Sequence, residues 1–258
     1  MDLFFCVSLW KRAATRLFHI AMILTCLSVC TVFDACRSTN EKAHVLIVTG
    51  GHDYDREEFK RLLDALPVTY EHVEHPHAHA MLKAGVIAKY DVVLLYDMPP
   101  EIPEEAQSDF VAMLEQGKGL VVLHHALGSY PRWPEYTNIA GGKYHFSQWV
   151  KDSTVCPPSE YAHDMTFQIR VADKNHPVTK GVSDFQIIDE TYNRIETLPS
   201  VHPLLVTDEP SSCPLIAWTN SYRKARVVTI LSGHDEKAWQ NPSFQKILTQ
   251  AILWTAKR

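Results

Sequence analysis

Several motifs that mark well-known enzyme classes are missing from this sequence of 258 residues. It has no G-x-S-x-G run that would present a serine nucleophile, no Walker loop, and no G-x-G-x-x-G run after its first buried strand. Tight binding of ATP or of a dinucleotide is therefore disfavoured, and no nucleotide cofactor is expected. Basic residues are not in excess, because the net charge is −5. Non-specific binding to nucleic acid is disfavoured as well.

Cysteine is scarce in the main part of the chain. Four of the six cysteines lie within the first 36 residues, which leaves Cys156 and Cys213. Two cysteines do not form a disulfide framework, so the fold must be held by its apolar core. They are either two buried thiols or one optional bridge.

The N-terminal segment differs from the rest in charge and hydropathy. Lys11, Arg12 and Arg16 precede an apolar run over residues 17–33, and Ala35-Cys36 then leads into a polar stretch. This order resembles a bacterial lipoprotein signal. We therefore expect a signal peptide over residues 1–36, a polar tether over 37–43 and a periplasmic or cell-surface protein, membrane-tethered through Cys36. A simple N-terminal membrane anchor is the alternative. Contact with a membrane is expected only through this segment.

From residue 44 onward, short apolar runs alternate with segments of helical period. Runs such as 45–48, 92–96 and 120–123 have the continuous apolar character of strands buried on both faces. This pattern predicts a single α/β domain over residues 44–258, with a mostly parallel sheet covered by helices. The region from about residue 128 to 164 lacks a clear period and is expected to be a functional loop or lid.

Histidine is abundant, with fourteen residues in the chain. Three of them follow predicted buried strands: His52 in Gly50-Gly51-His52-Asp53, His124 beside His125, and His234 in Gly233-His234-Asp235. The carboxyl ends of parallel strands form the usual ligand-binding edge of such sheets. Each histidine alone would suit a cap or a turn. Together they predict one shared site.

Two further segments are expected to complete that site. One is Asp189-Glu190-Thr191-Tyr192, and the other contains His145. We expect His52, His124, Glu190 and His234 to be catalytic, and Asp53, His125, His145, Asp189 and Tyr192 to contact the substrate. Imidazole and carboxylate groups suit Zn, Mn, Fe or Ni, and His52, His124 and His234 are the candidate ligands of a divalent transition metal. The same groups without metal would act as general acid and base.

Other aromatic and histidine residues have a structural explanation beside the functional one. Trp133 and Trp218 are candidates for stacking on a sugar ring, although tryptophan also fills cores. The run from His72 to His79 contains His75 and His77 and looks like a metal-binding tract. We interpret it instead as a solvated loop.

The motifs, taken in order, resemble the ThuA-like (trehalose utilisation) family. They are Gly50-Gly51-His52-Asp53, Leu123-His124-His125-Ala126, Gly141-Gly142 with His145, His176-Pro177-Val178-Thr179-Lys180-Gly181, Asp189-Glu190-Thr191-Tyr192, Pro214-Leu215-Ile216-Ala217-Trp218, Arg226-Val227 and Gly233-His234-Asp235. The resemblance implies a flavodoxin-like three-layer sandwich, similar to the class I glutamine amidotransferases. The position of the amidotransferase nucleophile holds His124, so glutamine hydrolysis is not implied. Many relatives have a small polar residue where this chain has His125, and which of His124 and His125 faces the pocket stays open.

The resemblance also implies a substrate class. Family members are associated with the uptake and breakdown of trehalose and related disaccharides, often alongside sugar oxidoreductases, so such an oxidoreductase is an expected partner. We expect an exported enzyme that acts on a glycoside or its keto form. A non-catalytic sugar-binding lipoprotein and a metal-dependent amide or ester hydrolase are the alternatives.

Overall fold

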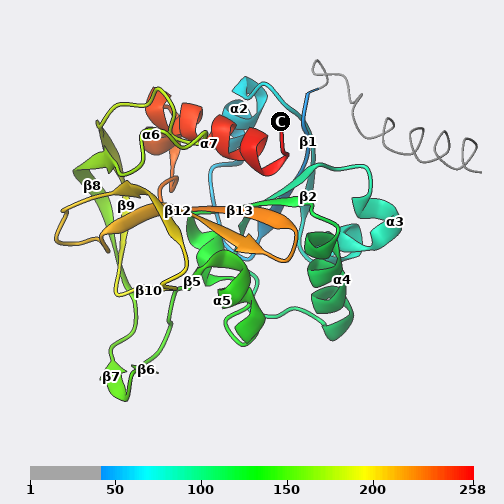
Figure 1. Ribbon diagram of the computed structural model, residues 1–258, viewed down its shortest axis with the longest axis horizontal. Coiled ribbons are helices and arrows are strands. Elements are labelled where there is room, and N and C mark those ends of the chain that lie inside the picture. Colours follow the sequence, from blue (N-terminus) through cyan, green and yellow to red (C-terminus); the bar gives the residue numbers. More distant parts are fainter. Residues whose placement is uncertain (1–41) are drawn as a thin grey trace, which may run out of the picture. The chain divides into compact units, whose positions relative to one another are not determined.

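A computed structural model describes residues 42–258 (Figure 1). The predicted signal peptide, with Cys36, and residues 37–41 of the predicted tether lie outside the described residues. Within residues 42–258, no helix is long and apolar enough to cross a membrane.

A mixed sheet of nine strands forms the centre of the described domain, in the order β2-β1-β3-β4-β13-β12-β11-β8-β9. These strands are β1 (His44–Gly50), β2 (Thr69–Glu74), β3 (Val92–Asp97), β4 (Gly119–Leu123), β8 (Glu160–Val171), β9 (Phe185–Asn193), β11 (His202–Val206), β12 (Leu215–Tyr222) and β13 (Ala225–Ile230). The five strands from β2 to β13 pair in parallel, and the other four are added by antiparallel pairing. The α/β class with a largely parallel core, expected from the sequence, is confirmed.

Helices cover both faces of the sheet and make three layers (Figure 1). The helical segments are α2 (Arg56–Ala65), η1 (His77–Leu82), α3 (Ala84–Ile87), α4 (Glu104–Glu115), η2 (His124–Gly128), α5 (Pro134–Ala140), α6 (Glu236–Trp239) and α7 (Pro242–Thr255). Alternate residues of β1 enter opposite cores: Val45 and Ile47 pack with α2, α6 and α7, whereas Leu46 and Val48 pack with α3, α4 and α5. Because a strand's side chains alternate between its faces, a strand covered on both sides must be apolar throughout.

The region from residue 128 to 164, predicted as a long loop, contains regular structure. It holds α5, the short strands β5 (Gly142–Lys143), β6 (Trp149–Lys151) and β7 (Thr154–Cys156), and the first half of β8. β5 pairs with β10 (Glu196–Thr197), and β6 with β7 form a hairpin that projects at the lower left of Figure 1. The strands have no apolar period because most of their side chains are exposed. Cys156 and Cys213 are free thiols, which answers the question of a bridge.

The direction of β9 explains how a distant segment reaches the ligand-binding edge. Four successive antiparallel pairings lead from β13 through β12, β11 and β8 to β9. Each pairing reverses the strand direction, so β9 runs in the same direction as the parallel strands. Residues near its carboxyl end therefore lie at the same edge as the ends of β1, β4 and β13. The beginning of the antiparallel strand β8 lies there too.

Candidate functional site

Three loops at the carboxyl ends of parallel strands bring the predicted histidines to one edge of the sheet. His52 follows β1, His124 begins η2 directly after β4, and His234 follows β13. The backbone turns sharply at each place: Gly51 has φ +82°, His124 φ +55° and Gly233 φ +120°. A positive φ costs energy in a non-glycine residue, so the turn at His124 persists because the packed surroundings hold it.

His124 is fully buried and oriented by a backbone carbonyl. Its Nδ1 lies 2.6 Å from the carbonyl oxygen of Leu231 and donates to it. In the neutral ring this leaves Nε2 as the nitrogen with a lone pair. Nε2 lies 2.9 Å from the hydroxyl of Tyr192, 3.0 Å from Oε2 of Glu190 and 3.2 Å from Nδ1 of His234.

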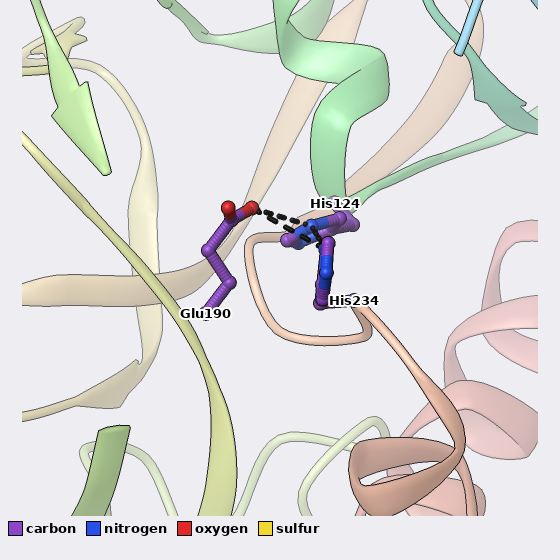
Figure 2. Close-up of side chains that lie close together, drawn as sticks. All are labelled: His124, Glu190 and His234. Atoms are coloured by element: carbon purple, nitrogen blue, oxygen red, sulfur yellow. Dashed lines mark hydrogen bonds and ion pairs between the residues drawn. The ribbon is translucent and has the colours of Figure 1, made fainter. Parts of the chain in front are cut away.

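Glu190 is the carboxylate on which the imidazoles converge (Figure 2). Its side chain is 7% exposed, and Oε2 lies 3.5 Å from Nδ1 of His234 in addition to its contact with His124. The other oxygen, Oε1, lies 3.1 Å from Nδ1 of His163. Burial alone would raise the pKa of Glu190. The hydrogen bond from His124 and the charges of His124 and His234 outweigh it and hold this pKa below its ordinary value.

Asp189 holds the loop that carries His234. Its buried carboxylate accepts hydrogen bonds from the backbone N–H groups of Gly233 at 2.7 Å and of His234 at 3.0 Å. Two carbonyls of the same loop accept hydrogen bonds from the core: the hydroxyl of Tyr96 donates to the carbonyl of His234, and the indole of Trp239 donates to that of Gly233. Burial raises the pKa of Asp189 to about 6. Asp189 thus holds this loop in place and does not line the pocket, and its contact with substrate stays a prediction.

A pocket of about 270 Å³ opens over this cluster. Glu190, His234, His52 and His125 line it. The remaining lining residues are Met98, Leu127, Gly128, Tyr144, Phe146, Tyr161, His163 and Tyr192. His124 lies behind this wall, fully buried, so His125 is the member of the pair that lines the pocket.

His125 is unusual because neither ring nitrogen has a hydrogen-bond partner, although the residue is only 4% exposed. Its ring stacks against His52, with centroids 4.4 Å apart, and packs at a tilt of 51° against Tyr96, with centroids 4.2 Å apart. Burial lowers the pKa of His125 well below its ordinary value, so the ring is neutral at pH 7. Unpaired buried nitrogens are costly and rare in folded proteins.

His124, Glu190 and His234 are the described residues whose donor atoms could together hold a metal ion, since these atoms all lie within 4.8 Å of one another. This cluster shares His124 and His234 with the predicted ligand set and has Glu190 in place of His52. His52 is turned away by its stacking on His125 and by a 2.7 Å bond from its Nδ1 to the carbonyl of Asp53. Glu190 takes its place because β9 reaches the same edge as the parallel strands.

Seven lining residues were not predicted from the sequence: Met98, Leu127, Gly128, Tyr144, Phe146, Tyr161 and His163. The last four belong to the region expected to be irregular. His163 lies near the beginning of β8, and a histidine at the start of an antiparallel strand faces the same edge as one at the end of a parallel strand. Interpreting residues 160–171 as one long strand would have predicted His163 at this edge of the sheet.

Both predicted tryptophans are part of the apolar structure instead of the pocket. Trp218 is fully buried, and its indole donates to the carbonyl of Ala140 at 2.9 Å. Trp133 packs edge-on against Phe110 and Tyr130 and lines a separate hollow beside Arg132. The prediction that Trp218 binds substrate was wrong, because the residue is fully buried against α5. Trp133 does not line the pocket beside Glu190, and its contact with substrate stays a prediction.

His145 and Asp53 also lie outside the pocket lining. His145 stacks on Trp149, with ring centroids 4.1 Å apart, and bonds Glu196 at 2.8 Å. Its neighbours Tyr144 and Phe146 face the pocket, so the alternation of the chain turns His145 to the other side. The Asp53 side chain is exposed, and only its carbonyl contacts the site through His52.

The histidine tract is not a solvated loop. His75 is 10% exposed and bonds the fully buried carboxylate of Asp97 at 2.8 Å, while His72 bonds the hydroxyl of Thr49. His77 remains exposed at the start of η1. The tract thus stabilises the end of β2 and was misread because its partners, Asp97 and Thr49, are distant in sequence.

Comparisons with known proteins agree with this architecture. A family model described as ThuA, trehalose utilisation, matches residues 44–255. A ThuA-like protein from Parabacteroides merdae is similar in structure, with a TM-score of 0.70 at 20% identity over 84% of this chain and 90% of that one. A ThuA-like protein from Bacteroides uniformis has a TM-score of 0.60 at 17% identity, over 86% and 94%. Comparison with curated proteins gave no match.

A third similar structure corrects the predicted location. It comes from Salmonella typhimurium, has a TM-score of 0.55 at 13% identity over 82% of this chain and 98% of that one, and is named a cytoplasmic protein. The expected periplasmic or cell-surface location is contradicted by this finding. The expectation depended on the charge and hydropathy of the first 36 residues, which lie outside the described domain, and not on the fold.

Proposed function

Because the chain belongs to the ThuA family, whose model is described as trehalose utilisation, we propose that it is an enzyme that acts on trehalose or on a related disaccharide or keto-glycoside. The observation that carries this proposal is Glu190, a nearly buried carboxylate contacted by three imidazoles at the wall of the pocket. Such a concentration of proton-transfer groups beside a cavity is typical of an active site.

The lining of the pocket supports a sugar as the substrate. Tyr144, Phe146 and Tyr161 line it, and the last two are 55% and 59% exposed. Exposed aromatic rings at a pocket can pack against the apolar face of a sugar ring while polar groups bind its hydroxyls. Among the described residues that line the pocket, none is Lys or Arg. We therefore expect an uncharged, unphosphorylated sugar.

Each group has a role in the proposed reaction. His52, whose Nδ1 bonds a carbonyl, has Nε2 left to accept a proton from a sugar hydroxyl or from the carbon beside a carbonyl. His234 and Glu190 contact the reacting oxygen, and His124 orients them from behind. His125 and Tyr192 contact the substrate. A protonated imidazole, or a divalent metal at the same three residues, would stabilise the negative charge that develops on the oxygen.

The test is turnover of trehalose and of its keto derivative, followed by mass spectrometry. We expect Glu190→Gln and His52→Ala to lower kcat at least about 100-fold, a typical contribution of one acid–base group, with little change in melting temperature. His77→Ala, an exposed histidine outside the pocket, is the matched control. Wild-type turnover in both pocket variants would refute the assignment, and sugar binding without product would indicate a binding protein instead. A keto substrate would also require a sugar oxidoreductase upstream, which we propose as the partner.

A further inference from the structure

We propose that His124, Glu190 and His234 form a three-ligand centre for one divalent transition metal ion, with its open side toward the pocket. The three donor atoms are Nε2 of His124, Oε2 of Glu190 and Nδ1 of His234, and their separations are 3.0, 3.2 and 3.5 Å. Ligands about 2.1 Å from a metal, at tetrahedral or octahedral angles, are about 3.0–3.4 Å apart. The triangle therefore has the size of one face of a metal's coordination shell.

The hydrogen bonding of the ligands supports the same centre. A metal-binding histidine usually donates its other N–H to a carbonyl or carboxylate, which fixes the ring and leaves the lone pair for the metal. His124 does this through the carbonyl of Leu231 at 2.6 Å. Oε1 of Glu190 is held by His163, so Oε2 is the oxygen that faces the two histidines. The backbone of His234 is held by Asp189.

The arrangement also suits a positive charge at its centre. Nε2 of His124, Nδ1 of His234 and Oε2 of Glu190 converge within 3.5 Å, and each atom can offer a lone pair to a cation. The competing explanation is hydrogen bonding without a metal, in which a ring N–H of His124 or His234 donates to Glu190 and the hydroxyl of Tyr192 contacts Nε2 of His124. Two imidazoles and one carboxylate form the ligand set of many catalytic zinc and non-haem iron sites, which keep positions open for the substrate.

The exposures of the three side chains show which side of the proposed metal centre faces the pocket. His124 is fully buried, whereas Glu190 is 7% and His234 25% exposed, and the latter two line the pocket. A metal bound by all three would face the cavity of about 270 Å³. The inference deepens the proposed function by assigning a cofactor to the same site.

The experiment uses the full chain purified without a polyhistidine tag. The protein is stripped with a chelator and titrated with Zn²⁺, Mn²⁺ or Co²⁺ alone; bound metal is measured by elemental analysis, Co²⁺ coordination by its visible absorption, and stability by the melting temperature. We expect about one equivalent per chain and a rise in melting temperature, because a ligand that binds only the folded state stabilises it. Glu190→Gln, which keeps the shape of the side chain, should weaken binding at least about 10-fold, because the loss of a ligand should cost no less than the loss of a group that orients one. His124→Ala should abolish it.

Two further variants test whether the metal is bound by His124, Glu190 and His234 or by other histidines. His52→Ala should keep the metal, because His52 is not part of the triangle, and His77→Ala should keep it because its ring is exposed elsewhere. Loss of metal in His77→Ala, with retention in Glu190→Gln, would show adventitious binding and overturn the proposal. So would the absence of bound metal and of any cobalt band in the wild type, which would favour hydrogen bonding without a metal.

The outcomes also separate this inference from the proposed function. A protein that binds no metal but loses sugar turnover in Glu190→Gln would keep the enzyme assignment and lose the metal. A protein that binds one metal through the three residues but turns over no sugar would keep the metal centre and lose the substrate class.

Discussion

Two nearly buried histidines near the pocket differ in what their ring nitrogens contact. His75 bonds the carboxylate of Asp97, whereas both nitrogens of His125 lack a partner. Leaving a buried polar group unpaired costs about 1–3 kcal/mol. Proteins retain such a cost mainly where function requires it. His125 is thus a residue at which stability and substrate binding should oppose each other.

His125→Phe tests that opposition. The phenyl ring would keep the packing against His52 and Tyr96, and the two unpaired nitrogens would be lost. We expect the free energy of unfolding, measured in urea, to stay the same or rise by about 1 kcal/mol, while sugar binding measured by calorimetry falls. His75→Phe is the control and should lose at least about 2 kcal/mol, because it leaves the buried carboxylate of Asp97 with only the longer hydrogen bonds from Ser129 and Tyr130. A loss of stability in His125→Phe as large as in the control would contradict this interpretation.

At the scale of elements, the loop between β1 and α2 determines where His52 lies. Gly51 has φ +82°, and a Cβ there would lie 2.5 Å from backbone atoms of Met98. Neither the dihedral angle nor the space suits a side chain. The glycine is therefore what lets the loop pass close to the chain after β3 and place His52 over His125.

Gly51→Ala should displace that loop. We expect a loss of stability above about 2 kcal/mol, larger than a simple change of helix propensity and consistent with backbone strain, together with a fall in kcat from the misplaced His52. The matched control is Gly85→Ala in α3, where a Cβ would meet no atom within 4 Å. This control should be neutral or stabilising by up to about 1 kcal/mol, since alanine favours helix. Circular dichroism melts of both variants give the comparison, and equal effects would refute it.

For the whole molecule, the many histidines predict a characteristic response to acid. Burial lowers the pKa of His72, His79 and His176, all outside the pocket, and that of His79 to about 4. Between about pH 4 and 6.5 the unfolded chain therefore binds more protons than the folded one. Stability from these groups is complete above pH 6.5 and is lost as the pH falls toward 4. Asp97 and Asp189, whose pKa values are raised by burial, act in the opposite sense but are fewer.

Urea unfolding from pH 4.5 to 7.5 would measure this response. We expect the free energy of unfolding to rise with pH through the interval and to level off above about pH 6.5. His79→Asn removes one such group, so its profile should be flatter than that of the wild type, whereas His77→Asn, an exposed neighbour, should leave the slope unchanged. A profile that is flat or falls with pH in the wild type would show that the carboxyl groups dominate.

Particular residues show why the fold was predictable and the site only in part. Runs such as 45–48 and 120–123 are apolar throughout because both faces of their strands are buried, a local property that can be read without knowing the partners. The same hydropathy pattern predicted that His52, His124 and His234 lie at strand ends. It did not predict which side chains they contact. The orientation of His145 away from the pocket depends on its contacts with Trp149 and Glu196, and the burial of Trp218 depends on its packing against α5.

The sequence by itself determined the class of fold, the edge of the sheet where the polar groups gather and the family to which the chain belongs, because these depend on local hydropathy and on the order of short motifs. Only the tertiary structure decided that Glu190 replaces His52 beside His124 and His234, that His163 joins them and that His125 lines the pocket. The physical reason is the antiparallel extension of the sheet. Four strands added beyond β13 return β9 to the direction of the parallel strands, and that register, set by pairings between distant segments, brings residues 190 and 124 to within 3.0 Å of each other.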